Sequence, residues 1–144
     1  MPWERIAHLI QKEDFCFQSW SDRHGSGIWA ALGTTDTPLN LVHDLSSAGD
    51  LDMIPAMEYV RSAQWLPYVT GETFEEAMQQ LEDRLARLPP DQLTRNSPWS
   101  RLVDETLAAL DEATRGCSWY DAPSRQPLPL KPLPATFEQA LVGI

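Results

Sequence analysis

The spacing of apolar side chains predicts a helix followed by a β-hairpin at the start of the chain. In residues 2–12 apolar positions recur at helical intervals. Residues 15–20 alternate between apolar and polar side chains instead, which is a strand pattern. The glycine-containing segment 22–27 is typical of a turn, so we expect residues 28–32 to return as the second strand of the hairpin.

Two further helices are marked by capping signals in the second half of the chain. Thr73 and Glu76 have the spacing of a capping box, and the helix that follows is expected to end at Pro89-Pro90. Ser97 is a suitable N-cap for the next helix, because Pro98 then takes the first helical position. The apolar faces of these two helices comprise Phe74, Ala77, Met78, Leu81, Leu85 and Leu88 in the first, and Trp99, Leu102, Val103, Leu107 and Leu110 in the second.

The stretch between the hairpin and these helices has no clear period. Residues 33–58 are predicted to form a long acidic insertion without lysine or arginine, in which only residues 40–42 have the character of a short strand. Pro38 lies in a loop-like segment of this stretch, and Pro55 interrupts its last apolar run. Residues 65–69 have a strand pattern, but the proline among them restricts that strand to the edge of a sheet.

The C-terminal part of the chain differs in composition from the rest. Residues 123–134 contain five prolines, which favours extended backbone, and a short capped helix is expected before the C-terminus. We therefore expect a single domain over residues 1–122 and a proline-rich arm over residues 123–144. The predicted fold is α+β, a small antiparallel sheet with helices covering one face, an acidic insertion and the proline-rich C-terminal arm.

The charge of the chain narrows the classes of partner. The formal net charge is −10, from 21 acidic and 11 basic side chains, and such a surface repels the phosphate backbone of nucleic acids. Direct nucleic-acid binding is therefore disfavoured and a basic protein partner is favoured, although an acidic surface also serves plain solubility. No apolar run is long enough to span a membrane and no signal-peptide pattern opens the sequence, so a cytoplasmic location is the simplest placement.

No spacing of reactive side chains predicts a catalytic or metal site. The two cysteines, Cys16 and Cys117, lie far apart, and neither pairs with a histidine at ligand spacing. Asp50 and Asp52 resemble part of a calcium loop, but the glutamate such a loop needs downstream is missing. We therefore predict no metal, no cofactor and no enzymatic activity.

Two local features resemble known folds. The segment Tyr68–Ala77, with the order Gly-Glu-Thr-Phe-Glu-Glu-Ala at its end, resembles the strand-to-helix junction of HicB-type antitoxins. The order of helix, strands and helix resembles a double-stranded RNA-binding domain. This chain lacks the basic helix start with which such domains bind phosphates, so the resemblance implies a fold and not RNA binding.

These observations favour a non-enzymatic, acidic protein-binding module that inhibits or regulates a basic protein, including one that handles nucleic acid. In size and charge the chain is similar to anti-defence inhibitors of mobile elements, such as anti-CRISPR proteins. We expect acidic residues to steer association and exposed tryptophans to anchor it. The predicted partner-binding residues are Asp36, Asp44, Asp50, Asp52 and Glu58, with Trp20, Trp65 and Trp119. Two alternatives stay open: a small enzyme or ligand-binding protein, and a structural subunit that self-assembles into a homo-oligomer through the C-terminal arm.

Overall fold

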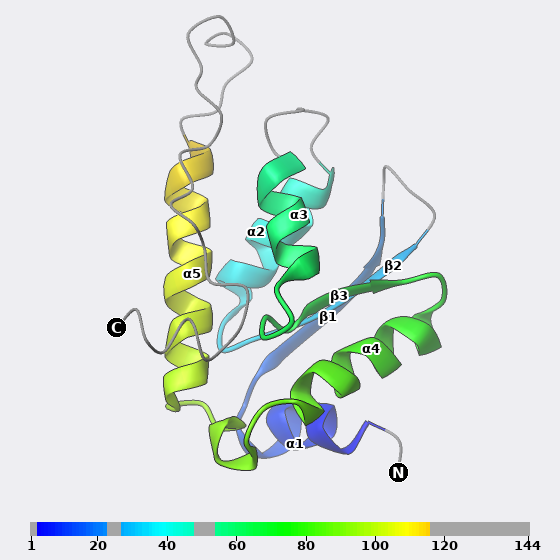
Figure 1. The fold of residues 1–144 in the computed structure, drawn as a ribbon, viewed down its shortest axis with the longest axis vertical. Coiled ribbons are helices and arrows are strands. Elements are labelled where there is room, and N and C mark those ends of the chain that lie inside the picture. The colour runs from blue at the N-terminus through cyan, green and yellow to red at the C-terminus, as the bar shows by residue number, and fades with distance from the viewer. Residues whose placement is uncertain (1–2, 23–26, 48–53, 116–144) are drawn as a thin grey trace, which may run out of the picture.

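The computed structural model describes residues 3–22, 27–47 and 54–115, shown in colour in Figure 1. Its elements in chain order are α1 (Glu4–Lys12), β1 (Cys16–Ser21), β2 (Ile28–Gly33), α2 (Asp36–Ser47), α3 (Ile54–Ser62), β3 (Tyr68–Gly71), α4 (Phe74–Ala86), the 3-10 helix η2 (Pro90–Gln92) and α5 (Pro98–Arg115). The predicted α+β class is confirmed.

The three strands form one antiparallel sheet in the order β1-β2-β3. The hairpin pairs Trp20 with Trp29, and β3 joins the other side of β2 with Val69 opposite Ala30. The third strand lies at the edge, as predicted, but it begins just after Pro67 and ends at Gly71, two residues beyond the expected end.

Helices cover both faces of this sheet, whereas the sequence predicted one covered face. Figure 1 shows α1 and α4 on one side of the sheet and α2 and α3 on the other, with α5 packed beside α2. The central strand agrees with this arrangement, because every residue from Trp29 to Gly33 is buried. Consecutive strand residues point to opposite faces, so burial of all of them requires a layer on each side.

The predicted insertion over residues 33–58 is the main correction to the fold. It contains α2 and most of α3, and the segment 40–42 belongs to a helix and not to a strand. Pro38 and Pro55 each occupy the first turn of a helix, where the missing N–H has no intrahelical partner to lose. Because the sequence pattern assigned Pro38 to a loop and Pro55 to an interruption, it did not predict the starts of these two helices.

The two capped helices are confirmed with their caps. The Glu76 N–H donates to Thr73 Oγ1 over 3.1 Å, and the Ser100 N–H donates to Ser97 Oγ over 3.1 Å. The first turn of α4 packs directly on β3, because a Cβ on Gly71 would lie 2.5 Å from the backbone nitrogen of Ala77. A glycine is therefore needed where the strand meets the helix.

Several predicted features lie outside the described residues. These are Asp50, Asp52, Trp119, Cys117 and the proline-rich arm over residues 123–144. Within the described residues, none of the helices has the length and apolar character required to cross a membrane.

Candidate functional site

The predicted acidic residues that the structure describes lie on the helical layer formed by α2, α3 and α5. Asp36 and Asp44 are exposed on α2, and Glu58 is exposed on α3. Neither the Asp44 nor the Glu58 carboxylate forms an ion pair or hydrogen bond with any described residue. Their charge therefore faces solvent, and no described residue compensates it by direct contact.

The predicted tryptophan anchors have a different role. Trp65 is only 3% exposed, and its backbone oxygen accepts a hydrogen bond from Trp99 Nε1 over 2.8 Å. The expectation that Trp65 is an exposed anchor is therefore wrong. It lies in the connection from α3 to β3, where no apolar period indicated which way the ring would point.

Trp20 is half-buried and forms part of an aromatic stack. Its ring lies on Trp29 with centroids 5.7 Å apart and on His43 of α2 at 4.8 Å, while its Nε1 donates to Ser46 Oγ over 3.0 Å. The Arg61 guanidinium of α3 lies 5.6 Å from the Trp29 ring. The stack joins both helices to the sheet, so the Trp20 ring contributes to the stability of the domain and is half-buried where full exposure was expected.

Six arginines of the described residues are engaged within the chain. Each of them donates a side-chain hydrogen bond to another part of the protein: Arg5, Arg61, Arg84, Arg87, Arg95 and Arg101. The positive charge of these six is thus held in structural contacts, while most acidic side chains of the described residues face solvent.

A groove of about 490 Å³ lies between α2 and α5 and is the candidate site. Each helix lines it with residues at spacings of three, four and seven, so one stripe of α2 faces one stripe of α5. The lining residues are Thr34, Thr35, Thr37, Pro38, Asn40, Leu41 and Asp44 from the α2 side, and Asp104, Leu107, Ala108 and Asp111 from α5. The groove thus combines apolar walls with three aspartates, and none of its described lining residues is a lysine or arginine.

Asp104 is held in a defined position at the end of the groove where α2 begins. Thr34 lies two residues before the start of α2, and its hydroxyl is 3.0 Å from each oxygen of the Asp104 carboxylate and donates to it. Partial burial of Asp104 raises the pKa of its carboxyl above the ordinary value, although the Thr34 hydrogen bond acts in the opposite direction. Asp104 forms no ion pair with any described residue, and the charge of Arg95 acts on it only at longer range.

Tyr68 contributes a second polar group near Asp104. Its side chain is fully buried, and no described atom is placed to form a hydrogen bond with its hydroxyl. Burial raises the pKa of this hydroxyl first, and the negative charge of Asp104 raises it further. The two groups therefore lie within electrostatic range of one another in a region of low polarity.

The sequence reasoning missed Asp104, Asp111 and the role of Thr34. The available signal was the seven-residue spacing of the two aspartates, with Leu107 and Ala108 between them on the same helix face. A matching stripe occurs on α2, but residues 36–47 had not been recognised as helical, so the two stripes could not be paired.

The described residues do not gather metal ligands or an activated nucleophile. No three histidine, cysteine or carboxylate side chains among residues 3–22, 27–47 and 54–115 could together hold a metal ion. Cys16 is a free thiol whose pKa is raised by burial, then by the hydrogen bond to Asp36 and by nearby negative charge. A raised thiol pKa disfavours the thiolate that nucleophilic chemistry needs.

The comparisons with known proteins found no match to a family model, to a curated protein or to a solved structure.

Proposed function

We propose that this chain is a non-enzymatic protein-binding module that inhibits or regulates a basic protein, and that the layer of α2, α3 and α5 is its binding surface. The observation that carries the proposal is the groove between α2 and α5, which has apolar walls and three aspartates, with no basic residue among the lining that the structure describes. Interfaces of specific complexes combine a desolvated apolar centre with complementary charge around it.

The distribution of charge supports the same surface. Asp36, Asp44 and Glu58 are exposed on the helices of this layer, and the net charge of the chain is −10. A negative field of this kind accelerates encounter with a positively charged partner. A protein that grips nucleic acid presents such a positive surface, so we propose a partner of that class, of the anti-defence or immunity type, in the cytoplasm. Nucleic acid itself is repelled by the same field.

The test is the association rate with a basic partner isolated from the host of the protein. We expect the triple variant Asp36→Asn, Asp44→Asn, Glu58→Gln to associate several-fold more slowly at low salt, because charges at the rim of an interface accelerate encounter. Raising the salt towards physiological ionic strength, where the Debye length is roughly 8 Å, should reduce the difference between the variant and the wild-type protein.

A matched control keeps the change in total charge but moves it to another face. Glu72, Glu75 and Asp83 are exposed on α4 or beside it. The variant Glu72→Gln, Glu75→Gln, Asp83→Asn therefore removes an equal number of negative charges, three, from the opposite layer. This control should associate almost as fast as the wild-type protein. Equal slowing by both triple variants, or an association rate indifferent to salt, would reduce the acidic surface to a role in solubility.

A further inference from the structure

We propose that the groove between α2 and α5 receives an arginine side chain from the basic partner. This inference rests on the proposed function and specifies how the partner is anchored. Because Trp20 and Trp65 are engaged inside the domain, the described tryptophans do not supply a protruding anchor. A pocket on this chain that accepts an anchor from the partner is the complementary arrangement, and arginine is among the residues enriched at such positions.

The walls of the groove suit the aliphatic part of an arginine. Pro38 and Leu41 contribute apolar surface from α2, and Leu107 and Ala108 contribute it from α5. A volume of about 490 Å³ falls within the range of roughly 300–1,000 Å³ that is common for sites that enclose small ligands. The methylene stem of an arginine gains from burial against such walls while its charged head stays among polar groups.

The polar groups of the groove suit the guanidinium head. Three carboxylates, from Asp44, Asp104 and Asp111, are distributed around the lining, and they are not gathered closely enough to form a metal site among the described residues. A guanidinium presents five N–H donors in a planar arrangement, and it is more weakly hydrated than an ammonium group. Dispersed carboxylates beside apolar walls therefore favour arginine over a metal ion or a lysine.

The Asp104 end of the groove suits the charged head in particular. The Asp104 carboxylate is half-buried and forms no ion pair with any described residue, so the approach of a positively charged donor is favoured there. Thr34 already orients the carboxylate, so little rearrangement is required there.

The experiment is an NMR titration of the full-length, ¹⁵N-labelled chain with three probes of equal backbone. The probes are the amides of Nα-acetyl-arginine, Nα-acetyl-lysine and Nα-acetyl-norleucine, where the last has an apolar stem and no charge. We expect the arginine probe to shift the backbone amides of Leu41, Asp44, Ala108 and Asp111, and the other two probes to bind about tenfold more weakly, which corresponds to about 1.4 kcal/mol. Norleucine binding as well as arginine would show a merely apolar groove, and lysine binding as well as arginine would remove the proposed specificity.

Two variants test whether the groove itself is responsible. The double variant Asp104→Asn, Asp111→Asn should weaken arginine-probe binding about tenfold, whereas the matched variant Glu75→Gln, Asp83→Asn should leave it unchanged. Ala108→Trp fills the groove from an exposed helix position, so it should abolish the shifts while every carboxylate and the rest of the spectrum are retained. Shifts that persist in the filled groove, or that weaken equally in the α4 control, would overturn the proposal.

The outcome is separable from that of the proposed function, because these probes need no protein partner. If the arginine probe binds in the groove but the triple variant of Asp36, Asp44 and Glu58 associates with the partner at the wild-type rate, the proposed steering surface fails and the arginine site stands. If the steering result holds and the probe does not bind, the arginine site alone is rejected.

Discussion

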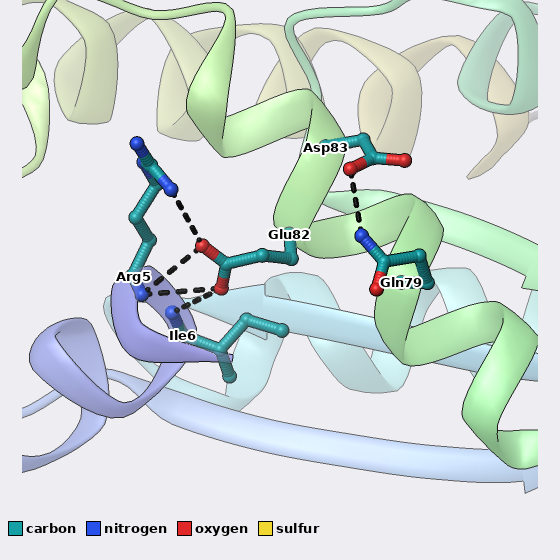
Figure 2. A network of polar contacts seen from close by, with 5 residues as sticks. All are labelled: Arg5, Ile6, Gln79, Glu82 and Asp83. Carbon is teal, nitrogen blue, oxygen red and sulfur yellow. Dashed lines mark hydrogen bonds and ion pairs between the residues drawn. The ribbon is translucent and has the colours of Figure 1, made fainter. Parts of the chain in front are cut away.

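The two helical layers of this domain treat charge in opposite ways. In the layer of α1 and α4, buried charges reach across to other elements and are fully hydrogen-bonded. Glu82 of α4, only 8% exposed, accepts from the backbone N–H groups of Arg5 and Ile6 at 3.1–3.2 Å, as Figure 2 shows. These bonds cap α1, whose own N-cap residue, Trp3, forms no side-chain cap. Arg84, also 8% exposed, lies with its Nη1 within 2.8–3.4 Å of four carbonyl oxygens around the end of α3 and the start of β3.

On the side of the sheet covered by α2, α3 and α5, several polar groups are incompletely paired among the described residues. Asp104 is partly buried without an ion pair, Asp44 and Glu58 face solvent, and the buried Tyr68 hydroxyl of β3 has no described partner. Buried polar groups that are fully paired stabilise a fold, whereas incompletely paired groups on a concave surface retain capacity for another molecule. The comparison therefore supports a stabilising role for the first layer and agrees with the binding role proposed for the second.

The largest effect should come from Arg84, because its single side chain satisfies carbonyl groups on several connections. We expect Arg84→Met to lower the free energy of unfolding by about 3–5 kcal/mol, because several buried carbonyl groups lose a charged donor and each unsatisfied group costs about 1–3 kcal/mol. Chemical denaturation measures this change. Arg84→Lys retains the charge with fewer donors, so its loss should be smaller than that of the methionine variant. A methionine variant with an unchanged denaturation midpoint would show that the network contributes nothing to stability.

The next effect should come from Glu82, which tests whether α1 depends on a cap from another helix. Glu82→Ala leaves two buried N–H groups without an acceptor, so we expect a loss of about 1–3 kcal/mol in the free energy of unfolding. The pair with the Arg5 side chain should matter less, because that side chain is 46% exposed and exposed ion pairs contribute little. Arg5→Ala should therefore cost under about 1 kcal/mol. The neighbouring exposed carboxylate provides the control, since Asp83→Ala removes an acceptor that is bonded only by the Gln79 side chain among the described residues. Equal losses for Glu82→Ala and Arg5→Ala would assign the stabilisation to the ion pair instead.

Sequence reasoning identified the elements whose signals are local. Thr73 and Ser97 are recognisable as N-caps because their side chains accept hydrogen bonds from the backbone of the first helical turn, and the structure contains both hydrogen bonds. Pro38 and Pro55 are local signals that remain ambiguous. A proline is compatible with the first turn of a helix as well as with a loop, and the surrounding pattern of apolar residues did not decide between them.

The candidate site depended on long-range placement and was therefore only partly predictable. Asp44 was named as a partner-binding residue from charge alone. Its juxtaposition with Asp104 and Asp111 required knowledge that α2 exists and packs beside α5. Trp65 was misassigned for the same reason, since its burial depends on the hydrogen bond and packing supplied by Trp99 from a helix more than thirty positions away.

A smaller, pH-dependent effect should distinguish Asp104 from the satisfied carboxylate of the other layer. Because burial raises the pKa of Asp104 in the folded state above its ordinary value of 3.8, the folded protein binds more protons than the unfolded chain between these two values. The associated stability is present below pH 3.8 and is lost as the pH rises through the raised value. Asp104→Asn cannot titrate, so the stability of the wild-type protein relative to this variant should fall over that window.

Urea denaturation of both proteins between pH 3.5 and 7 measures this difference. Thr34→Val provides the directional control, because the hydrogen bond from Thr34 lowers the pKa of Asp104 and its removal should move the window to higher pH. A wild-type protein that instead becomes more stable relative to Asp104→Asn as the pH rises would mean that a cation already neutralises this carboxylate.

The smallest effect should come from the Tyr68 hydroxyl, and it tests the claim that this polar group lacks a partner. Removing a buried hydroxyl that makes no hydrogen bond eliminates only its desolvation cost, so Tyr68→Phe should be neutral or should stabilise the protein by up to about 1 kcal/mol.

Tyr59 is the matched comparison. Burial raises the pKa of Tyr59 to about 12, but its hydroxyl has a hydrogen bond with Trp65. Tyr59→Phe should therefore lose about 0.5–1.5 kcal/mol of stability, the usual net contribution of such a bond. Thermal and chemical denaturation of the two variants side by side measure the contrast. If Tyr68→Phe destabilises the protein as much as Tyr59→Phe does, the Tyr68 hydroxyl is already satisfied, and it no longer counts among the incompletely paired groups on the side of the sheet covered by α2, α3 and α5.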